Sequence, residues 1–340
     1  MGKTKVGIIN VTGYAGVELA RLLYQHPQVE LTTITGRSTA GQKLGKVFPH
    51  LDSIDLTIEA KLGDVDLAFS AMPHKESAKE IISLLNRGIK VVDISADFRL
   101  KDAAEYLSWY GFTHPDPQLL KQAVYGMPEL YRSRVVSTRL VANPGCYPTG
   151  AILALAPAVK AGLIEPDIII DSKSGVSGAG RTTSLQTHYP EVNEDATAYA
   201  LDGHRHLPEI TQELKLLYSE RLPSVTFVPH LIPMTRGILT TGYATLSSDK
   251  KEEEVRQCYL DFYKDEPFVR VVESPPHTKH TWGNNLCLIY PTIDVKTGKL
   301  IVISCIDNLI KGAAGQAIQN MNLMLNLPEV TGLEALAIYP

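Results

Sequence analysis

Short apolar runs and amphipathic segments alternate along the N-terminal part of the chain. The apolar runs have the length and the β-branched content of strands and cover Lys5–Asn10, Val29–Thr35, Val65–Ser70 and Ile89–Ser95. Between them, apolar positions recur with helical spacing from Val17 to Leu23 and again over Lys75–Asn86. Strands separated by helices form βαβ units, so the sequence predicts an α/β domain with a parallel sheet.

The pattern changes after the middle of the chain. A helical segment over Thr149–Lys160 is followed by strand-like runs with few helices between them: Ile168–Lys173, Val225–Pro229, Ile238–Leu246, Leu286–Tyr290 and Leu300–Ile306. Further helices are predicted over Glu252–Tyr263 and Gly312–Asn326. Strands clustered in this way are typical of a largely antiparallel α+β domain, so the change of pattern places a domain boundary near residue 145.

The composition is that of two folded domains. The chain has 340 residues, of which 44% are hydrophobic, and a domain usually contains about 100–200 residues. The 33 Lys and Arg residues nearly balance the 37 Asp and Glu residues, which gives no reason to expect nucleic acid as a partner. No apolar run approaches the roughly 20 residues of a membrane span, and the N-terminus lacks a secretory signal, so we expect no membrane partner.

The four cysteines are widely spaced along the chain. Cys146, Cys258, Cys287 and Cys305 lack the CxxC spacing of zinc or dithiol sites. We therefore expect no metal site and no disulfide scaffold, and a reducing, cytoplasmic setting. Cys287 and Cys305 lie in apolar strand-like runs and are expected in the core, while Cys258 lies on a predicted helix.

A glycine-containing loop, Asn10-Val-Thr-Gly-Tyr-Ala-Gly16, joins the first strand to the first helix, where dinucleotide-binding folds hold a pyrophosphate. Gly13 is expected to allow a tight turn and Gly16 a close approach of helix and strand, while the helix N-terminus offers N–H groups to phosphate. Asn10 replaces the first glycine of the GxGxxG pattern, and an ordinary strand-to-helix turn is the alternative. The predicted cofactor contacts are Thr12, Gly13, Tyr14, Ala15 and Gly16.

The end of the second strand indicates which nicotinamide cofactor binds. An acidic residue there would bind the ribose 2′-hydroxyl of NAD, but the chain reads Thr35-Gly36-Arg37-Ser38. A guanidinium beside a hydroxyl suits a 2′-phosphate. Arg37 and Ser38 therefore favour NADP(H), and the alternative for Arg37 is a solvated surface side chain.

Cys146 differs from the other cysteines because of its neighbours. The segment Asn143-Pro-Gly-Cys-Tyr-Pro-Thr-Gly150 precedes a helix expected to begin near Pro148. Cys146 would then lie at a helix N-terminus, where the helix dipole stabilises a thiolate. The alternative is a small buried residue at a turn.

A thiolate beside a nicotinamide cofactor indicates chemistry through a thioester, formed from an aldehyde by hydride loss or from an acyl phosphate in the reverse direction. Such chemistry needs an acid or base near the sulfur. The segment Gly203-His-Arg-His-Leu-Pro-Glu-Ile210 supplies two histidines just before a helix opening at Pro208. Either His204 or His206 could serve, and a structural role is the alternative for each.

These motifs together resemble the N-acetyl-gamma-glutamyl-phosphate reductase family over nearly the whole chain. The Pro-Gly-Cys-Tyr-Pro-Thr segment is the most specific of them. The other matching segments are Gly13–Leu19, Asp93–Leu100, Tyr125–Glu129, Ser174–Arg181, Gly203–His206, Pro229–Gly237 and Asp307–Gln316. The chain departs from the family pattern at Asn10 and in the stretch from Thr281 to Asn285.

The resemblance implies a Rossmann NADP-binding domain over residues 1–145, completed by a C-terminal helix within residues 307–340. It implies an α+β domain of the glyceraldehyde-3-phosphate dehydrogenase type over residues 146–306, for catalysis, substrate binding and dimerisation. The implied reaction is the NADPH-dependent reduction of N-acetyl-L-glutamyl 5-phosphate to N-acetyl-L-glutamate 5-semialdehyde and phosphate, in arginine biosynthesis. Homodimers or homotetramers are usual in such a family.

The resemblance also implies roles for individual residues. Cys146 would be the nucleophile and His206, which stands against the helix start, the acid/base, with His204 as its rival and otherwise a substrate-binding residue. Arg99 would bind phosphate, unless it forms an ion pair with Asp97 or Asp93. Ser174 and Arg181 are further substrate-binding candidates, or parts of an interdomain loop. Asn308 would lie near the nicotinamide carboxamide, or act as a turn or cap residue.

The sequence disfavours three other functions. A reductase of an aminoadipyl or glutamyl phosphate on a carrier protein would carry an Asn-Ala-Thr-Ala-like sequence after the cysteine, whereas this chain has Tyr-Pro-Thr-Gly. Aspartate-semialdehyde dehydrogenase lacks the His-Arg-His-x-Pro-Glu pattern. A non-catalytic NADP-binding regulator would have no need of Cys146, His206 and Arg99.

Overall fold

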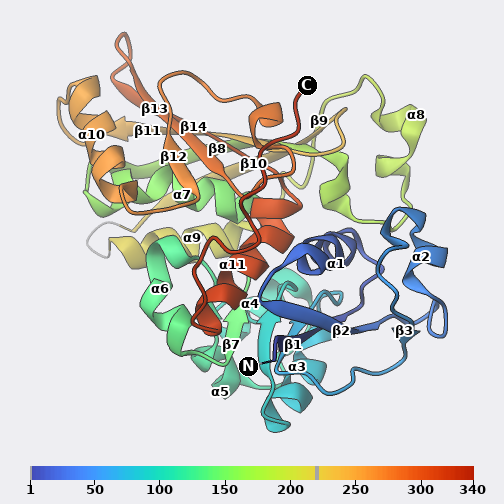
Figure 1. Cartoon of the computed structure of the whole chain (residues 1–340). Helices are drawn as coiled ribbons and strands as arrows, with labels where there is room; N and C mark the ends of the chain where they lie inside the picture. Colours follow the sequence, from blue (N-terminus) through green and yellow to red (C-terminus); the bar gives the residue numbers. More distant parts are fainter. Residues whose placement is uncertain (1, 219–221) are drawn as a thin grey trace. The chain divides into compact units, whose positions relative to one another are not determined.

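Two units, each built around its own seven-stranded sheet, make up the computed structural model, which describes residues 2–218 and 222–340. The first unit comprises Met1–Pro144 and Ala313–Glu334, and the second comprises Gly145–Gly312 and Ala335–Pro340 (Figure 1). None of the helices in these described ranges has both the length and the apolar character needed to cross a lipid bilayer.

The sheet of the first unit is parallel throughout, as the alternation of strands and helices predicts. Its strands lie in the order β3-β2-β1-β4-β5-β7-β6, and each neighbouring pair is parallel. Their bounds are β1 (Thr4–Ile9), β2 (Val29–Thr35), β3 (Ile58–Glu59), β4 (Leu67–Ser70), β5 (Lys90–Asp93), β6 (Val124–Tyr125) and β7 (Leu140–Ala142). All four residues of β4 are buried, as expected for the middle of such a sheet.

Helices surround this sheet, and one of them comes from the far end of the chain. The helices are α1 (Tyr14–Gln25), α2 (Leu44–Val47), α3 (Ser77–Asn86), α4 (Ala103–Tyr110), α5 (Pro117–Gln122), α6 (Pro128–Ser137) and α11 (Gly315–Met324). Helix α11 packs against α6 and α1 (Figure 1). Its polar side chains bind backbone groups of this unit: the amides of Gln316 and Asn320 both donate to the Gly126 carbonyl.

The second unit has a mixed sheet with the strand order β12-β13-β14-β11-β8-β10-β9. The pairs β8/β10 and β12/β13 are parallel and the other neighbouring pairs are antiparallel. The strands are β8 (Ile164–Gly175), β9 (Thr197–Ala198), β10 (Ser224–Ile232), β11 (Ile238–Leu246), β12 (Val269–Val271), β13 (Cys287–Asp294) and β14 (Lys299–Ile306). The α+β prediction for this part of the chain is confirmed.

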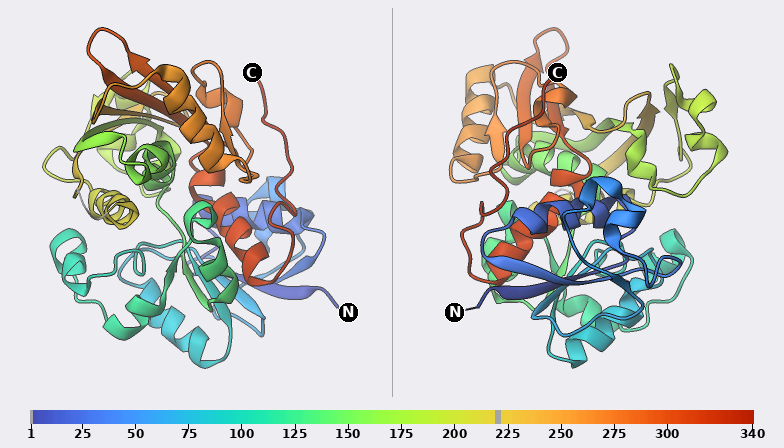
Figure 2. Two further views of the ribbon diagram at one scale, coloured as in Figure 1. Left: turned by 90° about the vertical axis from the view of Figure 1, so that its left-hand side faces the viewer. Right: turned by 45° about the vertical axis from the view of Figure 1, so that its right-hand side comes forward.

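Two helices of the second unit form a layer on its sheet. Helix α7 (Cys146–Lys160) contacts β11 and β14. Helix α10 (Glu252–Tyr263), the orange helix in Figure 2, contacts β12, β13 and α7. The hydroxyls of Tyr259 and Tyr263 donate to carbonyls of Ala154 and Leu153, which fixes α10 on α7. The remaining helices of this unit are α8 (Tyr189–Val192) and α9 (Leu207–Leu217).

The predicted helix start near Pro148 is wrong, because α7 begins at Cys146. Its cap residue Gly145 has an extended backbone, with φ −69° and ψ 155°, so helical geometry starts at the cysteine itself. The final predicted helix also divides, into a π-helical turn over Ile310–Ala314 and the regular helix α11.

The glycine loop differs from the prediction at Gly13. This residue is the extended cap of α1, with φ −77°, so it follows the turn at Val11 and Thr12 without needing the backbone freedom of glycine. The left-handed position is Asn10, with φ 63°, and asparagine tolerates this conformation better than most residues. Gly16 has the predicted role, because a Cβ atom there would lie 2.7 Å from the Val11 carbonyl oxygen.

Asn10 provides a test of this backbone geometry. We expect Asn10→Ala to unfold with a free energy about 1–2 kcal/mol below that of Asn10→Gly, because only glycine adopts positive φ without strain. Both variants lose the hydrogen bond from the Asn10 side-chain amide to the Ala71 carbonyl. The difference between their unfolding free energies therefore isolates the cost of the positive φ. Urea unfolding of the two variants measures it, and equal stabilities would contradict the assignment.

Candidate active site

Cys146 is the first residue of a long buried helix. It is partly exposed, whereas the residues of α7 from Tyr147 to Val159 are all buried. The first N–H groups of a helix have no partner within the helix, and together with the helix dipole they favour a negative charge. Cys146 is therefore a partly exposed residue at a helix N-terminus, a position that favours a thiolate.

The other cysteines have the environments that the sequence predicts. Cys287 and Cys305 are fully buried in strands β13 and β14. Burial raises the pKa of the Cys305 thiol to about 12, so this thiol stays protonated at neutral pH. Cys258 on α10 is partly buried, and burial raises its pKa as well.

A buried carboxylate holds the turn before Cys146. The Gly145 N–H donates to the Glu209 side chain at 2.8 Å, and Glu209 is fully buried in the first turn of α9. This bond joins the start of α7 to the start of α9. Since His206 is the cap residue of α9, the same bond links the segments that carry Cys146 and His206.

A second close contact limits the space around Cys146. The π-helical turn brings Gly312 so near that a Cβ atom at this position would lie 2.8 Å from the Cβ of Cys146. Real Cβ atoms do not approach each other so closely, so a larger residue at position 312 requires the cysteine or the π-helical turn to shift.

The two histidines of the His-Arg-His motif have different surroundings. Their ring centroids are 4.8 Å apart, and the ring of Tyr147 contacts both. His204 is also in contact with the rings of Tyr199 and Phe227. Burial, followed by the charge of Arg205, lowers the pKa of His204 to about 4, so this ring is neutral at physiological pH.

The remaining candidates of the second unit lie on its loops. Asn308 is buried, and its side chain accepts a bond from the Gly237 N–H and donates to the Ser177 hydroxyl. Ser174, at the end of β8, is also buried and donates to the Gly175 carbonyl at 2.9 Å. Arg181 lies on an exposed loop after Ala179.

Arg99 belongs to the first unit and is nearly fully buried. Its Nε donates to the Asn143 carbonyl at 2.8 Å, and its NH2 group donates to the Ile94 carbonyl at 2.7 Å. The neighbouring carboxylate of Asp97 accepts bonds from the N–H groups of Lys75 and Ala78. Arg99 therefore fixes the backbone three residues before Cys146.

The start of α1 has the features of a phosphate-binding site. A Cβ atom on Gly13 would have no heavy atom within 4 Å, so the space beside this residue is open. Gly13 is the cap residue of α1. Because glycine has no side chain, no side-chain cap bond is made to the N–H groups of the first turn. Tyr14 is exposed, and Thr12 and Ala15 are partly exposed.

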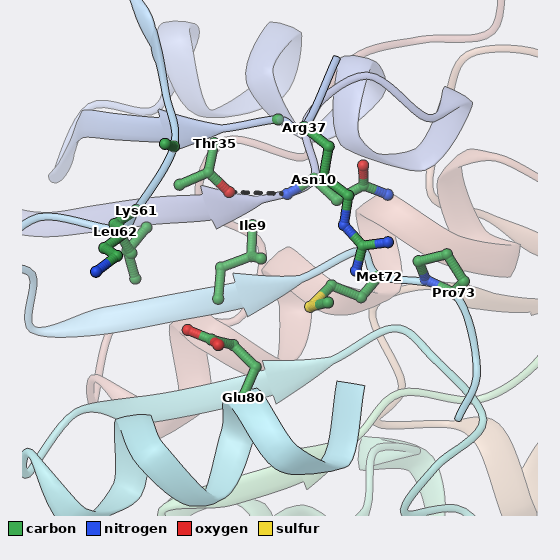
Figure 3. Close-up of a pocket in the computed structure, with 11 residues that line it drawn as sticks. Ile9, Asn10, Thr35, Arg37, Lys61, Leu62, Met72, Pro73 and Glu80 are labelled. Atoms are coloured by element: carbon green, nitrogen blue, oxygen red, sulfur yellow. Dashed lines mark hydrogen bonds between the residues drawn. The ribbon is translucent and has the colours of Figure 1, made fainter. Parts of the chain in front are cut away.

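A pocket of about 200 Å³ lies at the ends of β1 and β2 (Figure 3). Ile9, Leu62 and Met72 give it an apolar floor, and Arg37 and Lys61 give it two cationic side chains. Arg37 is not simply solvated: it forms an exposed ion pair with Glu76, which raises its pKa. Ser38 beside it is exposed.

Sequence reasoning missed several residues around these sites. Glu209 lies in the segment Gly203–Ile210 with the two histidines. Its position three residues after His206, in the first turn of the predicted helix, is the one sequence feature that points to it. Lys61 follows a two-residue strand and carries no motif. Arg236, paired with the buried Asp307 at 3.5 Å, lies in the family-like segment Pro229–Gly237, whose sequence alone indicates no role for it. In the described part of the chain, no group of three His, Cys, Asp or Glu residues could hold a metal ion.

Comparisons with known proteins define the class of this fold. Residues 5–138 match the family model "Semialdehyde dehydrogenase, NAD binding domain", and residues 146–308 match "Semialdehyde dehydrogenase, dimerisation domain". The fold is similar to that of aspartate semialdehyde dehydrogenase II from Vibrio cholerae, with a TM-score of 0.73 and 15% identity over 96% of this chain and 99% of that chain. The Candida albicans enzyme gives a TM-score of 0.69 with 15% identity over 95% of this chain and 99% of that chain.

More similar sequences define the family within that class. The N-acetyl-gamma-glutamyl-phosphate reductase of Dehalococcoides mccartyi is 59% identical over 100% of both chains. That of Pelotomaculum thermopropionicum is 50% identical over 99% of both. The chain therefore belongs to the N-acetyl-gamma-glutamyl-phosphate reductase family, as its motifs indicate.

Gly312 offers a test of the packing at Cys146. We expect Gly312→Ala to lower kcat at least about tenfold, because a misplaced reacting atom loses much of the benefit of fixed geometry. Gly63→Ala is the control, since its nearest atom would be 3.7 Å away in ordinary contact. Steady-state kinetics and thermal unfolding of both variants separate lost activity from lost stability. Full activity of Gly312→Ala would contradict the close approach.

Proposed function

We propose that this chain catalyses the NADPH-dependent reduction of N-acetyl-L-glutamyl 5-phosphate to N-acetyl-L-glutamate 5-semialdehyde and phosphate. The observation that carries this proposal is Cys146 at the N-terminus of α7, tied through Glu209 to the segment of His206, in a chain of this family. The reaction is a step of arginine biosynthesis.

The chemistry of Cys146 begins with attack of its thiolate on the acyl carbon. The carbon–oxygen bond to phosphate then breaks, phosphate leaves with the electron pair, and a thioester remains on the sulfur. NADPH, when bound, supplies the hydride that reduces this thioester. The resulting thiohemiacetal collapses, and Cys146 leaves as the thiolate. His206 holds the thiol proton before attack and moves a proton to and from the thiohemiacetal oxygen.

The residues of the first unit suit NADPH. The open space beside Gly13 and the first N–H groups of α1 would receive the pyrophosphate, with Thr12, Tyr14, Ala15 and Gly16 around it. Arg37 and Ser38 would bind the 2′-phosphate, for which Arg37 exchanges its exposed partner Glu76. Lys61, which lines the same pocket, adds a second positive charge.

Substrate binding is assigned to four polar residues, each by its own chemistry. Arg99 would contribute its guanidinium to the phosphate, in addition to its backbone bonds. Ser174 and Arg181 would bind phosphate or carboxylate oxygens, and Asn308 would lie near the nicotinamide carboxamide.

The working form is a homodimer or homotetramer. The match of residues 146–308 to a dimerisation domain supports this assignment. A reducing, cytoplasmic setting follows from the proposed chemistry, because a nucleophilic thiolate must stay reduced.

The enzyme activity is tested in the semialdehyde-oxidising direction. We expect phosphate-dependent NADP⁺ reduction with N-acetylglutamate semialdehyde, and little with aspartate semialdehyde or a carrier-bound substrate. Cys146→Ser should lower this turnover more than about 10³-fold while NADPH still binds, and His206→Asn about 10²–10⁴-fold. Substantial turnover of Cys146→Ser would refute the covalent mechanism, and a larger loss for His204→Asn would reverse the two histidines.

Cofactor preference is tested at Arg37. We expect Arg37→Ala to weaken NADPH binding about 10- to 100-fold and NADH binding less than about twofold, because only NADPH carries the 2′-phosphate. Fluorescence titration of each cofactor measures the two affinities. Arg87→Ala, an exposed arginine of the same unit outside the pocket, is the control. Equal losses for the two cofactors would argue against the assignment.

A further inference from the structure

A set of hydrogen bonds begins at the backbone of His206. Its N–H donates to Nδ1 of His204 at 3.0 Å. On the other side of the same ring, Nε2 lies 3.5 Å from the hydroxyl oxygen of Tyr199. Both nitrogens of His204 are therefore engaged within the protein.

The bonds continue toward Cys146. The Tyr199 hydroxyl donates to the Tyr147 hydroxyl at 3.1 Å, and Tyr147 donates to the backbone carbonyl of His230 at 3.2 Å. Tyr147 is the residue directly after Cys146 in α7. The bonds thus connect the backbone beside the proposed acid/base to the residue beside the proposed nucleophile.

The two ends of the set fix the direction of every bond. A backbone N–H can only donate, so Nδ1 of His204 must accept and its proton must be on Nε2. A backbone carbonyl can only accept, so Tyr147 must donate to His230 and accept from Tyr199. Tyr199 then accepts from Nε2–H of His204. The directions deduced from the two ends agree at Tyr199.

The surroundings keep each member in the required protonation state. Burial raises the pKa of Tyr199 to about 12, with a further contribution from the charge of Cys146, and burial raises that of Tyr147 further still. Burial and then the charge of Arg205 lower the pKa of His204 to about 4. Neutral His204 and protonated phenols therefore persist across the physiological pH range.

We propose that Tyr147, Tyr199 and His204 form a directional hydrogen-bond chain that positions His206 relative to Cys146. His204 is then a positioning residue, and neither a proton carrier nor a substrate ligand. The inference rests on the proposed function, because it takes Cys146 and His206 as the reacting pair. Together with the Glu209–Gly145 bond, the chain makes a second link between the segments of that pair.

Alkylation of Cys146 tests the chain without any substrate. The rate of iodoacetamide labelling at this cysteine, read by mass spectrometry across a pH series, reports formation of the Cys146 thiolate. We expect Tyr199→Phe to move the midpoint upward by about 0.5–1 pH unit, because His206 is held less firmly near the sulfur. Tyr24→Phe, which removes an exposed hydroxyl of α1, should leave the midpoint unchanged.

Kinetics add a second measurement to the same variants. We expect Tyr199→Phe to lower kcat about three- to tenfold and to change KM less than about twofold. Tyr147→Phe should have a similar effect, and the double variant should lose little more than either single one, because the residues act as one chain. Fully additive losses, or an unchanged alkylation midpoint, would overturn the proposal.

Two substitutions of His204 distinguish its alternative roles. The oxygen of His204→Asn takes the place of Nδ1 and accepts from the His206 N–H, while the amide nitrogen of His204→Gln takes the place of Nε2 and donates to Tyr199. We expect each to retain more activity than His204→Ala. A raised KM with unchanged kcat would identify His204 as a substrate ligand instead. A loss of kcat of about 10²–10⁴-fold in both His204→Asn and His204→Gln would identify it as a proton carrier.

Failure of the proposed function is distinguishable from failure of this inference. If the wild-type protein does not oxidise N-acetylglutamate semialdehyde, the proposed function fails. The alkylation midpoints of Tyr199→Phe and Tyr147→Phe still test whether the hydrogen-bond chain exists. Circular dichroism of each variant ensures that only folded protein is compared. A folded Tyr199→Phe with wild-type labelling and wild-type kcat would refute the hydrogen-bond chain and leave the proposed function standing.

Discussion

The hydrogen bond from the Gly145 N–H to the buried carboxylate of Glu209 is the constraint on which the geometry around Cys146 depends. A hydrogen bond within a protein contributes about 0.5–1.5 kcal/mol net, and a buried N–H left without an acceptor costs about 1–3 kcal/mol. The start of α7 and the start of α9 therefore cannot move apart without a large penalty. Because His206 caps α9, its backbone stays in a fixed relation to Cys146.

The chain on the other side of Pro144 is held with equal firmness inside the first unit. The Asn143 carbonyl accepts from Arg99, its amide donates to the Ala313 carbonyl, and Asn320 of α11 donates to its side-chain oxygen. Asn143 is fully buried, so its polar groups have no access to water and depend on these bonds within the protein. Helix α11, which returns to this unit, therefore holds both the sheet and the segment that leads to Cys146.

Much of the fold could be predicted from local patterns. Strands β2 and β11 and helix α10 have the predicted bounds, because each combines a clear period with end signals such as Pro, Gly or a run of charge. The elements that were missed are short or irregular. Helix α6, for example, is interrupted at Tyr131, whose φ of −134° breaks the period from which a helix is recognised. Residue types and motif spacing were sufficient to single out Cys146, but the exact residue at which α7 begins depends on the backbone of Gly145.

The two histidines show why the rest of the site needed a structure. In the sequence they flank Arg205, and only the position of His206 against the predicted helix start favours it over His204 for acid/base chemistry. In the structure His204 is enclosed by Tyr147, Tyr199 and Phe227, whereas His206 caps a helix. These aromatic residues come from three separate parts of the chain, so no local pattern reports that they meet. Burial of an imidazole favours its neutral form, and a neutral ring with both nitrogens bonded is suited to hold a neighbour in place and not to carry a proton.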